Sequence, residues 1–138
     1  MMALRQRIVA TSGLVLILAG AGTLLPLVAG PRAPRDVVVV ARAMAFYLGE
    51  DRRSPNPTIR VAPGERIRLT LISQDAGLSH DFAVDAWGVR TSTPHGDDRT
   101  SVIFQAPDEP GTADYVCARH AAMMKGTIEV TASATSVH

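Results

Sequence analysis

The sequence is poor in cysteine, in aromatic residues and in net charge. Its 138 residues include one cysteine, aromatics make up 4%, and the formal net charge is +1. A single cysteine excludes an intramolecular disulfide. Hydrophobic residues make up 46% and charged residues 20%, which excludes a disordered polar chain and a collagen-like repeat. The length allows one domain.

The charge is unevenly distributed along the chain. Four arginines give the segment before Asp36 a charge of +4, with no acidic residue among them. From Asp36 onward, 10 basic residues face 13 acidic ones, so this part carries −3. Phosphate binding needs net positive charge, and the composition therefore argues against a nucleic-acid partner.

A long uncharged segment stands near the start of the chain. Residues 8–30 contain no charged side chain and are rich in Leu, Val, Ile, Ala and Gly. Such a run can form a hydrophobic transmembrane helix. It is either a membrane anchor, which its length favours, or a signal peptide cut after a site such as Ala19-Gly20-Ala21. Both interpretations place the rest of the chain outside the cytoplasm, in the periplasm or at the outer face of the cytoplasmic membrane, either membrane-anchored or secreted.

The rest of the chain is predicted to be rich in short strands. Residues 1–35 are expected to comprise the leader and a Pro-rich tether, and residues 36–138 a single domain. Seven β-prone segments separated by Pro/Gly turns predict an antiparallel sandwich or barrel, and no segment has a convincing helical period. These segments are Asp36–Phe46, Thr58–Val61, Arg66–Leu71, His80–Asp85, Ser101–Phe104, Ala113–Cys117 and Gly126–Thr131.

Side chains that bind soft metals gather near the end of the chain. Cys117, His120, Met123 and Met124 fall within eight positions, and His80 lies upstream. Taken alone, Cys117 is a typical buried core thiol, and His80 is as readily a core histidine as a ligand. Together, one Cys, two His and a weak Met are the ligands of a mononuclear blue-copper site. Thiolate and thioether suit Cu(I), whereas imidazole serves both oxidation states.

On these residues the sequence resembles the cupredoxins, the small blue-copper proteins. His120 to Thr127 is similar to the azurin ligand loop, and Cys117-x-x-His120 is similar to the shorter spacing of plastocyanin and amicyanin. The resemblance implies an all-β, Greek-key antiparallel β-sandwich, here preceded by one N-terminal hydrophobic helix. It also implies one copper per chain, held by His80, Cys117, His120 and a methionine.

Two departures from the family pattern concern the ligands. An Asn often follows the upstream ligand His in the family, and Asp81 stands there in this chain. The loop also offers two adjacent methionines. Aligning Lys125-Gly126-Thr127 with the azurin loop selects Met124 as the axial ligand, whereas the shorter amicyanin-like spacing selects Met123. We prefer Met124, because an axial thioether is a weak, long contact that needs the correct strand phase.

The resemblance implies electron transfer by copper cycling between Cu(I) and Cu(II) among extracytoplasmic redox partners. The alternative is a copper-binding or delivery module that uses the same ligands without redox shuttling. An enzyme is not expected, because multicopper oxidases and copper nitrite reductases need further histidine clusters. The predicted domain of residues 36–138 contains only four histidines, namely His80, His95, His120 and His138. A dinuclear copper centre like that of cytochrome oxidase subunit II needs two cysteines.

The resemblance also predicts how partners would be contacted. The edge of the loop histidine reaches the surface in this family, so His120 is the expected electron port. Ala121, Ala122 and one methionine would surround it with a small apolar patch for redox protein partners. The domain of residues 36–138 is expected to be monomeric. The N-terminal segment would contact the membrane if it stays uncleaved.

Overall fold

The computed structural model describes Gly30, residues 32–93 and residues 98–132. The predicted hydrophobic helix therefore lies outside the described residues except for Gly30, and so do His95 and His138. The chain separates into two units, Met1–Gly30 and Pro31–His138, and the described strands all belong to the second. Within the described residues, no helix has the length and apolar character needed to cross a membrane.

The regular secondary structure in the described part of the second unit consists almost entirely of strands. A short 3-10 turn, η1 (Asp85–Trp87), is the one helical element among them. The strands are β1 (Arg35–Arg42), β2 (Ala45–Leu48), β3 (Ile59–Val61), β4 (Arg66–Ser73), β5 (Ala83–Val84), β6 (Val89–Arg90), β7 (Arg99–Gln105), β8 (Gly111–Val116) and β9 (Lys125–Val130).

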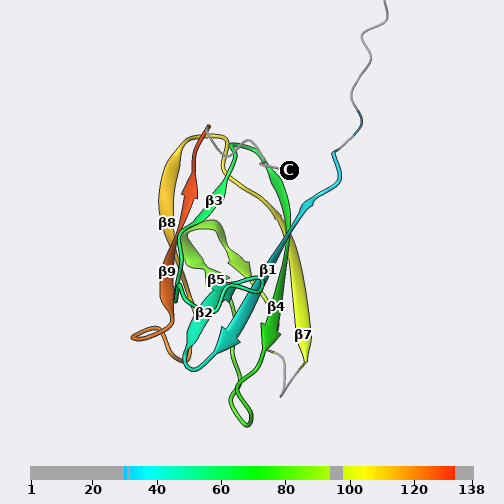
Figure 1. Cartoon of the computed structure of the whole chain (residues 1–138). Helices are drawn as coiled ribbons and strands as arrows, with labels where there is room; N and C mark the ends of the chain where they lie inside the picture. Colours follow the sequence, from blue (N-terminus) through cyan, green and yellow to red (C-terminus); the bar gives the residue numbers. More distant parts are fainter. Residues whose placement is uncertain (1–29, 31, 94–97, 133–138) are drawn as a thin grey trace, which may run out of the picture. The chain divides into compact units, whose positions relative to one another are not determined.

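The strands form two sheets that face each other across the core (Figure 1). One sheet has the order β2-β1-β4-β7 and the other β3-β9-β8-β5-β6. Neighbouring strands pair antiparallel, except that β1 lies parallel to β4 and β3 lies parallel to β9. The all-β sandwich predicted from the sequence is confirmed, with two parallel pairs within otherwise antiparallel sheets.

The core follows from the alternation of side chains along the strands. In β4, Ile67, Leu69 and Leu71 are buried, while the two arginines that alternate with them at the strand's start face solvent. Successive side chains of a strand point to opposite faces, so this pattern buries one face of the sheet. Three aromatic rings fill the space between the sheets, with centroids 5.0–5.7 Å apart: Phe46, Phe82 and Tyr115.

Two predicted strands differ from the structure. The segment Asp36–Phe46 is not one strand but a hairpin, because the chain turns at Ala43 and Met44, whose φ angles are 50° and 59°. Neither residue type favours positive φ, so no turn signal is present in the sequence. The segment His80–Asp85 is a strand only at Ala83–Val84. His80 instead lies in the irregular connection after β4.

The topology brings three connections to one end of the sandwich. β1 and β4 run parallel, so the Ala43-Met44 turn and the connection of residues 74–82 leave the first sheet at the same end. In the other sheet, Val116 at the end of β8 pairs with Lys125 at the start of β9 and with Ala83 at the start of β5. We call this end, which carries the turn, residues 74–82 and the loop of residues 117–124, the ligand end.

Candidate metal centre

The loop between β8 and β9 is short and closed by its own backbone. The Cys117 N–H donates to the Met124 carbonyl at 3.0 Å, which extends the β8–β9 ladder by one step. Within the loop, the His120 N–H donates to the Cys117 carbonyl at 3.0 Å, and the Met124 N–H donates to the His120 carbonyl at 2.8 Å. Three candidate ligands are therefore fixed relative to one another on eight residues of chain.

His80 reaches the same place from the other connection. Its side chain is fully buried, as is that of Phe82 two residues later. This segment is held by Thr91, whose hydroxyl accepts a hydrogen bond from the Phe82 N–H at 3.0 Å and whose N–H donates to the Phe82 carbonyl at 2.9 Å. His80 therefore points into the interior, although the residue does not lie on a strand.

The ligand atoms of His80, Cys117 and His120 all lie within 4.8 Å of one another. The Cys117 sulfur is 3.5 Å from Nδ1 of His120 and 3.9 Å from Nδ1 of His80. Metal–nitrogen and metal–sulfur bonds of 2.0–2.3 Å, set in a plane at 120°, place ligand atoms about 3.5–3.7 Å apart. Both distances to the sulfur are close to that spacing, so the three side chains fit a trigonal metal site.

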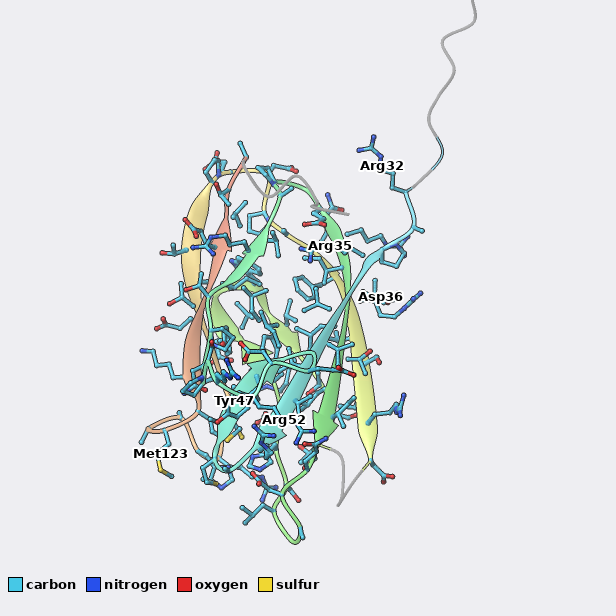
Figure 2. All side chains as sticks on the ribbon, viewed as in Figure 1. Arg32, Arg35, Asp36, Tyr47, Arg52 and Met123 are labelled. Atoms are coloured by element: carbon cyan, nitrogen blue, oxygen red, sulfur yellow. The ribbon has the colours of Figure 1, made fainter. Side chains whose placement is uncertain are left out.

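The two methionines of the loop occupy different environments. Met124 is fully buried and belongs to the hydrophobic core, whereas the Met123 side chain is 57% exposed. Figure 2 shows Met123 extending outward from the loop between β8 and β9. The buried environment of Met124 supports its assignment as the axial ligand, and that assignment stays a prediction.

Asp81 joins the two ligand-bearing segments. One carboxylate oxygen accepts a hydrogen bond from the Ala118 N–H at 2.8 Å, and the other accepts from Arg90 at 2.6 Å. Arg90 also bonds the Asp85 carboxylate at 2.9 Å. The residue after His80 is therefore tied directly to the residue after Cys117. Since a buried carboxylate needs a compensating charge, Arg90 is the partner that allows Asp81 to lie there.

The surroundings of Cys117 act on its thiol in both directions. Burial raises the pKa of the Cys117 thiol, and the Asp81 carboxylate acts in the same direction. Hydrogen bonds from the backbone N–H groups of Asp81 and Arg119 act the other way and favour the thiolate. The thiolate form is the one that binds a metal ion, and a bound cation would favour that form.

Asp75 was not identified from the sequence, yet it contacts His80. Its carboxylate accepts hydrogen bonds from the Ala43 N–H at 2.7 Å and the Met44 N–H at 3.3 Å, and lies 3.0 Å from Nε2 of His80. Burial opposes ionisation of Asp75, but the hydrogen bonds from Ala43, Met44 and His80 outweigh it and lower its pKa. Asp75 therefore stabilises the unexpected turn and touches a candidate ligand.

Asn56 was likewise not identified from the sequence. Its side-chain amide donates to the Met123 carbonyl at 2.9 Å, and its side-chain oxygen accepts from the Phe46 N–H at 3.0 Å. Asn56 thus links the ligand loop to β2. Asp75 and Asn56 act through contacts between segments far apart in the chain, and no local pattern marks them.

Comparisons with known proteins were made by sequence and by structure. A scan against protein-family models finds no match, and a search of the curated proteins finds no significant match. Among solved structures, auracyanin B matches with a TM-score of 0.57 and 23% identity over 73% of this chain and 92% of that chain. Auracyanin A, a "blue" copper protein from Chloroflexus aurantiacus, matches with a TM-score of 0.58 and 16% identity over 72% and 100%. The chain has a cupredoxin fold.

Other cupredoxin-fold structures agree. Rusticyanin from Thiobacillus ferrooxidans matches with a TM-score of 0.53 and 23% identity, over 70% of this chain and 76% of that chain. A chain of a heme-copper terminal oxidase dimer matches with a TM-score of 0.55 and 16% identity, over 71% and 65%. The resemblance predicted from the ligand loop is therefore confirmed at the level of the fold.

Proposed function

We propose that this cupredoxin-fold chain is a mononuclear blue-copper electron-transfer protein that holds one copper ion. The observation that carries the proposal is the cluster of His80, Cys117 and His120, whose ligand atoms lie within 4.8 Å of one another. Two imidazoles and a thiolate, with the buried Met124 thioether as the axial ligand, are the donor set typical of blue-copper electron-transfer sites.

Copper bound there would supply a one-electron couple between Cu(II) and Cu(I). The chain's own contribution is to keep the ligands in place in both states. Cys117 and His80 are fully buried, and the loop that carries Cys117 and His120 is closed by its backbone hydrogen bonds. Asp81 ties this loop to the segment of His80. A site that cannot rearrange needs little reorganisation when an electron enters or leaves.

His120 is the proposed electron port. Its side chain is half-buried, whereas His80 is fully buried, so only the loop histidine reaches the surface. The next three residues, Ala121, Ala122 and Met123, are exposed, and we propose that they form a small apolar patch beside it. Small apolar contacts suit the weak, transient encounters of redox proteins, and redox protein partners are the proposed occupants.

The proposed location is outside the cytoplasm, as the uncharged segment of residues 8–30 implies. We do not assign an enzymatic activity. One solved structure with the same fold belongs to a heme-copper terminal oxidase, but this chain has a single cysteine. A dinuclear copper centre like that of cytochrome oxidase subunit II needs two, so a mononuclear carrier fits the residues better.

Redox cycling separates an electron carrier from a copper-delivery module. The copper-loaded full chain is reduced with ascorbate and reoxidised with ferricyanide over several cycles, and bound copper is measured after each. An electron carrier loses and regains an intense blue colour while its copper content stays constant. A delivery module would hold colourless Cu(I) and release it to a competing chelator. His95→Ala serves as a control, because His95 is not a proposed ligand.

A further inference from the structure

The Asp75 carboxylate meets two backbone N–H groups and a ring nitrogen of His80 at the ligand end. Oδ1 accepts from the Ala43 N–H at 2.7 Å, while Oδ2 accepts from the Met44 N–H at 3.3 Å and lies 3.0 Å from Nε2 of His80. The Asp75 side chain is 14% exposed and that of His80 is fully buried. No metal ligand role is open to Asp75, because it faces the side of the imidazole turned away from Cys117.

The geometry fixes which nitrogen of His80 carries the proton. Nδ1 faces the Cys117 sulfur at 3.9 Å, and it must offer a lone pair to bind a metal ion. A neutral imidazole has one N–H and one lone pair. Its proton therefore lies on Nε2 and is donated to Oδ2 of Asp75. Metal-binding histidines are commonly oriented by a carboxylate that accepts a hydrogen bond from the other ring nitrogen, and Asp75 stands in that relation to His80.

The turn holds Asp75 in this position. Ala43 and Met44 both have positive φ, and their N–H groups point at the same carboxylate. The carboxylate is thus fixed by the backbone of a strand hairpin rather than by a flexible side chain. Moving Asp75 away from His80 would leave the N–H groups of this turn without their acceptor. The loss is costly for the Met44 N–H, because that donor is partly buried.

We propose that Asp75 is a positioning residue that lowers the reduction potential of the copper site through His80. This inference rests on the proposed function. An imidazole that donates to a carboxylate is a stronger electron donor, and a nearby negative charge favours the ion of higher charge. Both effects stabilise Cu(II) more than Cu(I). Asp75 therefore acts on the copper couple without contacting the metal.

The test compares Asp75→Asn with the parent, as copper-loaded full chains. Asparagine keeps the size of the side chain and removes its charge. The expected result is a protein that stays blue and has a higher reduction potential. Substitution of a residue that hydrogen-bonds a metal ligand alters metal affinity by about 10-fold or more. A 10-fold change in the ratio of Cu(II) to Cu(I) affinity corresponds to about 59 mV for one electron.

Asp36→Asn is the matched control. This substitution also removes one negative charge. The Asp36 side chain, however, is 65% exposed and bonds Arg68. It lies at the opposite end of β1 from the Ala43-Met44 turn. The reduction potential of Asp36→Asn should stay at the parent value, because solvent screens the charge of Asp36. Asp75→Glu, which restores a carboxylate, should bring the potential back towards the parent. A blue Asp75→Asn protein with the parent's potential overturns the inference and leaves the proposed function standing.

A second measurement does not depend on copper or on folding of the variant. Nitrogen NMR of the copper-free parent protein reports which ring nitrogen of His80 carries the proton. A proton on Nε2 supports the inference, and a proton on Nδ1 overturns it. A parent protein that binds no copper and develops no blue colour would overturn the proposed function and this inference together.

Discussion

Met123 and Met124 are adjacent in sequence and differ entirely in environment. Met124 is fully buried at the end of the loop that carries Cys117 and His120, whereas Met123 extends into solvent. The sequence allows either methionine to be the axial ligand, and the strand phase expected for an axial thioether favours Met124. The burial pattern supports that choice, because a thioether ligand must lie on the inner side of the loop.

Leucine substitutions separate the two methionines. Met124→Leu should raise the reduction potential and keep the blue colour, since a thioether donates electron density that stabilises Cu(II). Leucine has similar volume, so the loss of packing free energy should stay below about 1.5 kcal/mol. Met123→Leu is the matched control, and voltammetry should show little change in its potential. The opposite pattern would assign the axial position to Met123.

The connections between elements determine where the ligands lie. Asn56 spans from β2 to the ligand loop by accepting from the Phe46 N–H and donating to the Met123 carbonyl. Its φ angle is 50°, a region that Asn tolerates better than most residues. The residue therefore combines a backbone role with two side-chain contacts, and substitutions can separate them.

Asn56→Gly should lower the free energy of unfolding by about 1–2 kcal/mol, because two hydrogen bonds are lost while the backbone conformation is kept. Asn56→Ala should cost about 1 kcal/mol more, since alanine disfavours positive φ. Denaturant unfolding gives both values. Hydrogen exchange of the Met124 amide should be faster in both variants. Exchange at the parent rate would show that Asn56 does not hold the loop.

At the opposite end of the sandwich from Met123, as Figure 2 shows, β1 begins with Arg35. Arg35 binds the Glu65 carboxylate, which also accepts from the Ala62 N–H at 2.8 Å within the turn before β4. The hydrogen bond from Arg35 is the main cause that lowers the pKa of Glu65 below its ordinary value of 4.5. This contact joins the start of β1 to the turn.

A lowered pKa in the folded state gives this contact a defined pH dependence. Its stabilisation is present above the unfolded-state pKa and is lost as pH falls through the folded-state pKa. Glu65→Gln should therefore lower the free energy of unfolding by about 1 kcal/mol at pH 7. The difference from the parent should shrink below about pH 4.5. Glu129→Gln, which removes an exposed ion pair with Arg60, is the control and should change stability less at pH 7.

The elements could be predicted from the sequence where local patterns decide them. Alternation in Arg66–Leu71 correctly indicated β4, whose apolar residues are buried. The turn at Ala43 and Met44 could not be predicted, because its N–H groups are satisfied by Asp75, which is more than 30 residues away. The link from Asn56 to Met123 could not be predicted either, because these residues are 67 positions apart in the sequence.

The structure explains why position 126 of the ligand loop motif is a glycine. Gly126 pairs with Tyr115 across the β8–β9 ladder, and a Cβ atom at this position would overlap the tyrosine ring. The Tyr115 hydroxyl in turn donates to the Pro57 carbonyl at 2.6 Å. The sequence resemblance marked the glycine, but only the packing explains why a side chain cannot replace it.

For the whole molecule, the fold and the candidate ligands could be predicted together. Strand patterns indicated the sandwich, and the spacing of Cys117 and His120 indicated the loop. The structure then brings His80 to them through the parallel pairing of β1 with β4 and the pairing of β5 with β8. What the sequence could not supply is the surrounding set of contacts from Asp75, Asp81 and Asn56, since each depends on the completed fold.

The most direct test of this account is the absorption spectrum and copper content of the copper-loaded full chain, measured beside Cys117→Ser. We expect one copper per chain and an intense blue Cu(II) band in the parent, because the thiolate supplies the charge-transfer transition. Cys117→Ser should lose the band yet keep the circular dichroism of a β-sandwich. A serine variant as blue as the parent, or a folded parent that binds no copper, would contradict the account.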